Sequence, residues 1–250
     1  ELHSLFFELR QPDWWQGDSL YHPPAYDEPV SNLEAQLRTG QFTVTAEIAP
    51  PLGARDQTIE KWTDLFKGRV VAANFTDNAS AAPRLGSLAC ARLCLDYGLE
   101  PVLQIQTRDR TRVALESDAM GAAGLGMRNI LCLTGDHQIF GNHPTAKNVF
   151  DMDAIGMLMM VRDMRDKGVV QSGDKMDVPP CFFLGAAANP FADPFDFRPY
   201  RLAKKVKAGA NFIQTQIIFN VPEFAEYMKR VGDLGLLDDV YILGGVSPIK

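Results

Sequence analysis

The chain has 250 residues, of which 46% are hydrophobic and 22% are charged, so it can bury a large core and has the length of one α/β barrel or two small domains. Its net charge of -6 and its isoelectric point near 5.3 argue against the extended basic surface that binding to nucleic acid or to an anionic membrane requires. No apolar run reaches the roughly 18 residues that span a bilayer, and the first residues lack the order of a secretion signal. We therefore predict a cytoplasmic protein that acts on small molecules.

The first segment of the chain differs from the rest. Residues 1–31 contain Trp14, Trp15 and a loose Pro23-Pro24 pair without a regular pattern, which predicts a linker or the tail of a preceding module. A short amphipathic stretch at 32–38 follows, and we expect this helix to close the amino-terminal end of a barrel formed by residues 32–250.

From residue 42 onward, β-branched apolar runs alternate with helical patterns. The predicted strands are 42–49, 70–75, 101–106, 129–133, 181–186, 212–218 and 240–243. The predicted helices are 56–66, 83–97, 109–125, 152–167, 197–208 and 222–235. This alternation indicates parallel βαβ units, which form either a closed barrel or an open doubly wound sheet. The number of strands favours a (β/α)8 TIM barrel that is truncated after about the seventh strand. We therefore expect the chain to be a piece of a longer gene product.

Several familiar sites are absent from the sequence. It has neither GxGxxG nor GxxxxGK[ST], which disfavours a Rossmann dinucleotide fold and a P-loop. Its four cysteines show no CxxC spacing, and its four histidines show no metal-ligand spacing, so we assign no metal. Cys90, Cys94, Cys132 and Cys181 lie in apolar patterns, and we expect buried free thiols.

Polar residues end most of the predicted strands. Asp136 follows the apolar run 130–133 directly, and Glu47 lies inside the run 42–49 before a Pro-Pro pair. The carboxyl ends of barrel strands converge on one mouth, so both carboxylates are candidates for catalysis. Because Glu47 lies among apolar residues, we expect it to be partly desolvated, which favours the protonated form that a general acid needs.

Other polar residues at these strand ends have two interpretations. Asn78, Thr107 and Asp109 either line the mouth or cap the helices that follow them. His137, next to Asp136, either lines the site or is an exposed loop histidine.

Five motifs together resemble the 5,10-methylenetetrahydrofolate reductase family. They are TAEIAPP at 45–51, NFTDN at 74–78, TRDR at 107–110, LTGD at 133–136 and KVKAGAN at 205–211 with Thr215-Gln216. They occur in the order of that family across residues 32 to 250. The TRDR and LTGDHQ variants are more similar to the branch of anaerobic one-carbon pathways than to the enteric branch.

The resemblance implies a flavin-dependent (β/α)8 barrel that reduces 5,10-methylenetetrahydrofolate to 5-methyltetrahydrofolate, in one-carbon metabolism and methionine biosynthesis. It implies that Glu47 is the acid that protonates N10 and opens the folate ring to a 5-iminium cation. It implies that Asp136 is the carboxylate beside flavin and pterin that stabilises this cation, and that the amide of Gln216 contacts the pterin. Implied flavin contacts are Thr76, Gly135, Asp136, Phe150, Asp151 and Lys205, the last at the pyrophosphate. FAD is the expected cofactor, with FMN as the alternative.

The sequence departs from the family pattern at several positions, which limits the cofactor contacts that the resemblance implies. Thr134 replaces an arginine before the Gly-Asp pair, and residues 188–191 read ANPF instead of Ala-Tyr-Pro-Glu, so contacts to the flavin's ribityl chain and adenine are not assigned. The electron donor is either NAD(P)H or a redox partner subunit, and we expect an oligomer or a complex. The aromatic residues of the first segment either dock that partner or pack on the barrel; they are Phe6, Phe7, Trp14, Trp15 and Tyr21.

Other functions stay open at this point. A reductase of a related pterin that uses deazaflavin or no flavin is one alternative. A non-catalytic folate-binding or electron-transfer scaffold subunit is another, and a barrel with unrelated chemistry is a third.

Overall fold

A computed structural model of the chain describes residues 28–248, which fall into two compact units, 28–185 and 186–248. The tryptophans and the other aromatic residues of positions 1–27 lie outside the described residues. Their expected role in docking a partner therefore stays a prediction.

The first unit is built on four parallel strands. They are β1 (Thr45–Ile48), β2 (Ala72–Phe75), β3 (Glu100–Gln106) and β4 (Asn129–Leu133), paired in chain order. Phe75, Leu103 and Ile130 are aligned in register and fully buried. Side chains alternate between the two faces of a strand, so the other face carries Glu47 in register with Asn74, and Gln104 two positions along β3. One face of the sheet is thus apolar core, whereas the other carries these three polar side chains beside buried apolar ones such as Val102.

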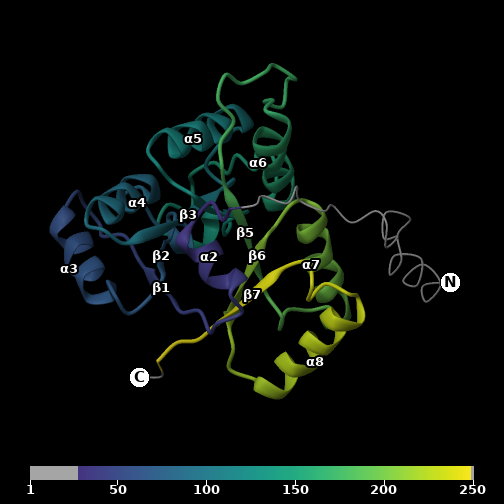
Figure 1. The fold of residues 1–250 in the computed structure, drawn as a ribbon. Coiled ribbons are helices and arrows are strands. Elements are labelled where there is room, and N and C mark those ends of the chain that lie inside the picture. The colour runs from purple at the N-terminus through teal and green to yellow at the C-terminus, as the bar shows by residue number, and fades with distance from the viewer. Residues whose placement is uncertain (1–27, 249–250) are drawn as a thin grey trace. The chain divides into compact units, whose positions relative to one another are not determined.

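Four longer helices accompany these strands. They are α3 (Asp56–Phe66), α4 (Ser87–Asp96), α5 (Arg112–Gly124) and α6 (Ala154–Lys167). Helix α3 packs beside α4, and α5 packs beside α6 (Figure 1). Thr111 and Asp153 cap the amino termini of α5 and α6 through their side-chain oxygens. Gly98 takes a φ of +84° just after α4, where the sequence predicts a helix end.

The short helix α2 (Asn32–Arg38) matches its predicted bounds. Glu100, at the start of β3, accepts hydrogen bonds from the Asn32 and Leu33 amides at 2.8 and 2.9 Å and from the Asn129 side chain at 2.9 Å. These contacts fix the amino terminus of α2 against the amino-terminal ends of β3 and β4. This position agrees with the expectation that the helix covers that end of the strands.

The second unit repeats the pattern. Strand β5 (Phe183–Ala188) crosses the boundary between the units, and β6 (Phe212–Ile217) pairs in parallel with β7 (Tyr241–Gly245). Helices α7 (Arg198–Lys207) and α8 (Val221–Asp233) lie beside each other (Figure 1). Gly209 takes a φ of +113° just after α7, where the predicted helix 197–208 ends.

The predicted fold class is confirmed. Seven parallel strands alternate with helices in the described residues, which is the repeating unit of a (β/α)8 TIM barrel. The predicted and observed bounds of the strands differ by up to three residues, because strand ends depend on pairing partners that a single sequence does not show. None of the helices in the described part of the chain has the length and apolar character that crossing a membrane requires.

The cysteines are free, and three of the four are buried. Burial raises the pKa of the Cys90 and Cys132 thiols to about 12 and that of Cys94 to about 11, whereas Cys181 is half-buried. Because the thiolate is the reactive form, we expect a thiol reagent at about pH 8 to modify Cys181 first in the native protein. The other three should react only after addition of denaturant. Peptide mapping of the labelled protein checks this, and rapid native labelling of Cys90 or Cys132 would contradict the described core.

Candidate functional site

The turn after β4 places a carboxylate just beyond the end of a buried strand. Gly135 has a φ of +87°, a backbone conformation that favours glycine, and a Cβ built there would meet the side chains of Gln106 and Arg108. The Thr134 hydroxyl accepts a hydrogen bond from the Ala154 amide at 3.0 Å, at the start of α6. Asp136 is exposed. The turn therefore holds the Asp136 carboxylate free to meet a ligand at the carboxyl end of the sheet.

Glu47 lies on the polar face of β1 and is exposed. The prediction that Glu47 is partly desolvated is therefore wrong for the part of the chain that the structure describes. The physical reason is that β1 is an edge strand there, with β2 as its paired neighbour. Nε2 of Gln104 donates to Oε2 of Glu47 at 3.4 Å, which ties the carboxylate to the buried amide of β3. A role for Glu47 therefore rests on its position on this face, not on burial.

Thr76 follows β2 and has an unsatisfied hydroxyl. The residue is 7% exposed, and its Oγ1 has no hydrogen-bond partner. A buried hydroxyl without a partner costs roughly 1–3 kcal/mol, a cost that a hydrogen bond to a bound ligand would remove. The neighbouring Asp77 is fully paired, since it accepts from the Arg110 guanidinium at 2.6 Å and from the Gln106 amide at 3.1 Å.

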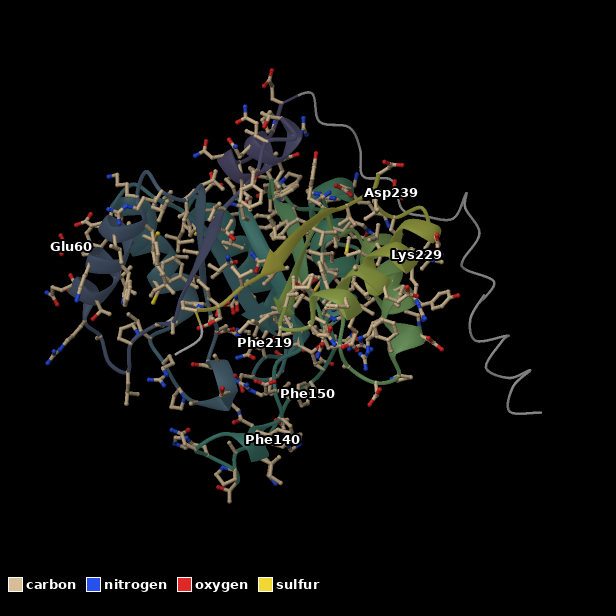
Figure 2. The ribbon with its side chains drawn as sticks, turned by 90° about the horizontal axis from the view of Figure 1, so that it is seen from below. Glu60, Phe140, Phe150, Phe219, Lys229 and Asp239 are labelled. Carbon is tan, nitrogen blue, oxygen red and sulfur yellow. The ribbon has the colours of Figure 1, made fainter. Side chains whose placement is uncertain are left out.

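Phe150 and Asp151 lie near the end of the long segment 134–153 that follows β4. Figure 2 shows Phe140 at the projecting end of this segment, with Phe150 nearer to the strands. Phe150 adopts a φ of +42°, a strained conformation for a large side chain and one that concentrates at functional sites. Asp151 accepts hydrogen bonds from the amide and the guanidinium of Arg112, which lower the pKa of Asp151 to about 2. Its carboxylate thus has a structural partner, and its predicted cofactor contact stays a prediction.

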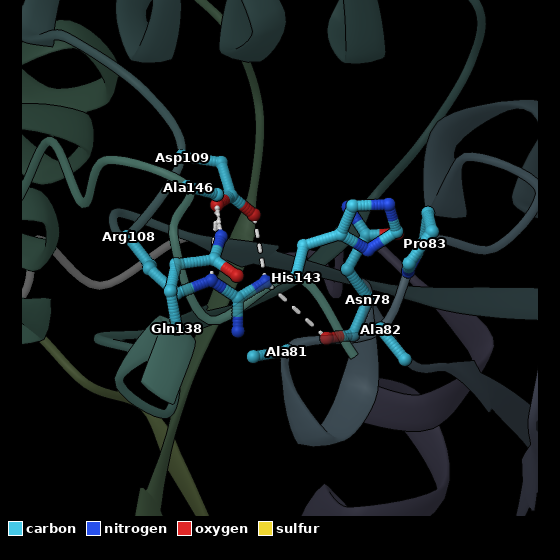
Figure 3. Close-up of a pocket in the computed structure, with 9 residues that line it drawn as sticks. All are labelled: Asn78, Ala81, Ala82, Pro83, Arg108, Asp109, Gln138, His143 and Ala146. Atoms are coloured by element: carbon cyan, nitrogen blue, oxygen red, sulfur yellow. Dashed lines mark hydrogen bonds and ion pairs between the residues drawn. The ribbon is translucent and has the colours of Figure 1, made fainter. Parts of the chain in front are cut away.

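A cavity of about 250 Å³ lies beyond the ends of β2, β3 and β4 (Figure 3). Its lining includes Asn78, Arg108, Asp109, Gln138 and His143. Asp109 accepts hydrogen bonds from Arg108 at 2.7 and 3.0 Å and from Gln138 at 2.8 Å. The hydrogen bond from Arg108 is the main reason why the pKa of Asp109 is lowered.

The structure decides the alternatives for the residues at these strand ends. Asn78 accepts from the Arg84 amide at 2.9 Å, and Asp109 pairs within the cavity, so neither caps a helix. The Thr107 hydroxyl donates to the Thr134 carbonyl at 3.4 Å, and Thr111 caps α5 in its place. The capping interpretation is therefore wrong for all three residues.

His137 is exposed in the loop after β4, as one of its two interpretations predicts. Its Nδ1 accepts from the Ile139 amide at 3.2 Å, and its Nε2 lies 2.7 Å from Nδ2 of Asn148. These contacts organise the turn around η3 (Gln138–Phe140).

Lys205 and Gln216 share a cavity of about 150 Å³ within the second unit. Lys205 donates to the Ala187 carbonyl, and Arg198 and Arg201 add two further cations to the lining. Tyr227 also lines the cavity; it is 1% exposed, burial raises the pKa of its hydroxyl, and the hydroxyl has no hydrogen-bond partner. Three cations around an unsatisfied donor favour an anionic group such as a phosphate.

The predicted site residues thus divide between the units. Thr76, Gly135, Asp136, Phe150 and Asp151 follow strand ends of the first unit, with Glu47 on β1, whereas Lys205 and Gln216 line one cavity of the second. Sequence reasoning gave no role to Arg108, Gln138 or Tyr227. The TRDR motif is the signal that points to Arg108, whereas nothing in the spacing of Gln138 or Tyr227 marks them.

Polar side chains beyond the carboxyl ends of parallel strands that alternate with helices define a (β/α)8-barrel protein with its site at those ends. The protein-family model described as Methylenetetrahydrofolate reductase matches residues 32–250 of this chain. The chain therefore belongs to the methylenetetrahydrofolate reductase family, and the resemblance seen in its motifs is confirmed.

Individual relatives agree with this assignment. The chain is 23% identical over 246 residues to the probable methylenetetrahydrofolate reductase (NADPH) of Caenorhabditis elegans, an alignment that covers 94% of this chain and 34% of the worm protein. It is 26% identical over 221 residues to the 5,10-methylenetetrahydrofolate reductase of Salmonella typhimurium, covering 84% of this chain and 66% of that enzyme. The chain thus spans about a third and just under two thirds, respectively, of the lengths of these relatives.

A solved structure shares the fold. It is an uncharacterized protein from Clostridium thermocellum that binds two copies of 5-methyl-5,6,7,8-tetrahydrofolic acid, with a TM-score of 0.60 and 13% identity. The match covers 85% of this chain and 68% of that protein. At this identity the likeness concerns the fold alone.

Proposed function

We propose that the chain is the barrel of a flavin-dependent enzyme that reduces 5,10-methylenetetrahydrofolate to 5-methyltetrahydrofolate, in the one-carbon metabolism that supplies methionine in the cytoplasm. Membership of the family supports this proposal. The observation that carries it is the turn at Gly135, where the positive φ favours glycine and an exposed Asp136 follows a buried strand. A fold scaffold has no need for a carboxylate held in this way.

The described residues fit a flavin. The unpartnered Thr76 hydroxyl offers a hydrogen bond at the end of β2, and the strained Phe150 lies in the same unit. In the second unit, the cationic cavity around Lys205 suits the phosphate of FAD or FMN. We assign cofactor contacts to Thr76, Gly135, Asp136, Phe150, Asp151 and Lys205. When bound, the flavin supplies hydride transfer to the folate.

The chain's own residues supply the proton for N10 of the folate and the negative charge that stabilises the cation. Glu47 gives a proton to N10 of the folate, which opens the five-membered ring, and the Gln104 amide orients the Glu47 carboxyl through its hydrogen bond. The negative charge of Asp136 stabilises the cation that forms at N5. The amide of Gln216 contacts the pterin. We assign the reductant to NAD(P)H or to a redox partner subunit, in an oligomer or complex.

The test uses the protein expressed from its complete gene. We expect it to purify with about one FAD or FMN per chain, seen by its visible absorbance, and to oxidise 5-methyltetrahydrofolate with an artificial dye as electron acceptor. Thr76→Val removes the unpartnered hydroxyl and keeps the shape of the side chain. Because one hydrogen bond is lost, flavin affinity should fall roughly 3- to 10-fold while the melting temperature does not fall.

Thr63→Val on α3 is the matched control, since Thr63 is a fully buried threonine. It should leave flavin affinity unchanged. A folded protein that takes up neither FAD nor FMN would refute the flavin assignment and favour a deazaflavin-dependent reductase. A protein that binds flavin and folate but never exchanges electrons between them would instead be the scaffold subunit.

A further inference from the structure

Arg108 is a fully buried cation that joins three strand ends. It follows β3 and is 1% exposed. Its guanidinium donates to the Asp109 carboxylate, to the Asn78 carbonyl at 3.3 Å and to the Asp136 carbonyl at 3.1 Å (Figure 3 shows the first two). Asn78 follows β2, and Asp136 follows β4. One side chain thus fixes the ends of β2, β3 and β4 relative to one another.

The main chain of Arg108 holds the same segment at two further points. Its amide donates to the Thr134 carbonyl at 3.0 Å, and its carbonyl accepts from the Val149 amide at 2.7 Å. These two contacts fasten both ends of residues 134–149, the segment that carries Asp136 and leads into the strained Phe150. The side-chain contact to the Asp136 carbonyl then fixes the position from which the Asp136 carboxylate projects.

The geometry is specific to arginine. A guanidinium is a planar fork with donors at fixed angles and makes four hydrogen bonds here, whereas a lysine ammonium has only three donors. Burying a cation is costly unless it is completely paired, so a simple packing role would be served better by an apolar side chain. Gly135, with a φ of +87°, precedes Asp136, and the Arg108 contact to the Asp136 carbonyl adds a fixed point on the other side of this turn.

We propose that Arg108 is a positioning residue that holds the Asp136 carboxylate in its working place through the Asp136 carbonyl. The proposal rests on the proposed function in one respect: it takes Asp136 to lie beside the flavin. Arg108 itself touches neither substrate nor cofactor in this role. Its substitution should therefore act through Asp136 and through no other group.

Arg108→Lys tests the proposal because it keeps the charge and removes the fork. Arg165→Lys is the matched control: Arg165 is also buried, pairs with the adjacent Asp166 and donates to the Phe182 carbonyl at 3.0 Å, but it lies on α6. Both variants should lose similar stability. In the cofactor-free protein, hydrogen exchange of the amides at 134–150 should rise roughly tenfold in Arg108→Lys, the loss expected for one or two hydrogen bonds, and stay unchanged in Arg165→Lys.

The reduction potential of the flavin-loaded protein distinguishes a loss of Asp136 positioning from a general loss of protein stability. Arg108→Lys should raise the reduction potential. When Asp136 is displaced, its negative charge lies farther from the flavin and destabilises the reduced, more negative form less than in the parent protein. In an Asp136→Asn background the same substitution should change nothing further, so the two effects should not add. Arg165→Lys should leave the potential unchanged in both backgrounds.

Two results would overturn the proposal. The first is unchanged exchange at 134–150 in Arg108→Lys. The second is an additive shift of the potential in the double variant. If Asp136→Asn alone leaves the potential unchanged, the proposed place of Asp136 has failed, and the exchange measurement alone decides for Arg108. If Arg108→Lys does not fold, Asp109→Asn keeps Arg108 but loosens its fork, and should give the same changes at smaller size.

Discussion

Glu47→Gln should slow folate reduction by orders of magnitude while the flavin stays bound and still accepts electrons from the reductant. The substitution keeps the size of the side chain and its contact with the Gln104 amide, but removes the proton that N10 needs. General acid catalysis typically contributes about 10²–10⁴-fold, so the folate half-reaction should slow by that factor. Stopped-flow measurement of the two half-reactions separates them, because each gives its own change in flavin absorbance.

A control for loss of an exposed carboxylate is Glu60→Gln on the outer helix α3. This variant should match the parent protein in both half-reactions. Because Glu47 is exposed, its replacement should also leave the melting temperature close to that of the parent protein. Near-normal folate turnover in Glu47→Gln would remove Glu47 from the acid role.

The alternation of strands and helices was predictable from the sequence because each element carries a local signal. Helix α3 and strand β4 have the predicted bounds, since the pattern of apolar residues and the flanking breakers both lie in the chain. Asp136 was predictable for the same reason: a buried strand that stops at a glycine and a carboxylate is visible in a short window.

The environment of the site residues was not predictable in the same way. The exposure of Glu47 depends on which strand lies beside β1, which its own apolar neighbours do not reveal. Arg108 looks like a surface residue in a charged motif, yet it is buried, because its partners come from positions 78, 109 and 136. Long-range pairing decides burial, and a single sequence records it only weakly.

Asp136→Asn should have two effects from the loss of one charge. The folate half-reaction should slow by about 10²–10³-fold, the range found when one preorganised electrostatic partner of a transition state is removed. The flavin's reduction potential should rise, because a nearby anion disfavours the reduced and more negative form. The side chain is exposed and keeps its size, so the fold should not change.

Redox titration and stopped-flow measurement of the folate half-reaction check these effects together. Asp174→Asn is the charge-matched control, since Asp174 is an exposed aspartate whose carboxylate accepts from the Ser172 hydroxyl in a separate turn. It should leave both quantities unchanged. A slower folate reaction with an unchanged potential would place Asp136 beside the pterin and away from the flavin, whereas a lowered potential would contradict its assigned place altogether. The sign of the shift, more than its size, therefore decides where this carboxylate acts.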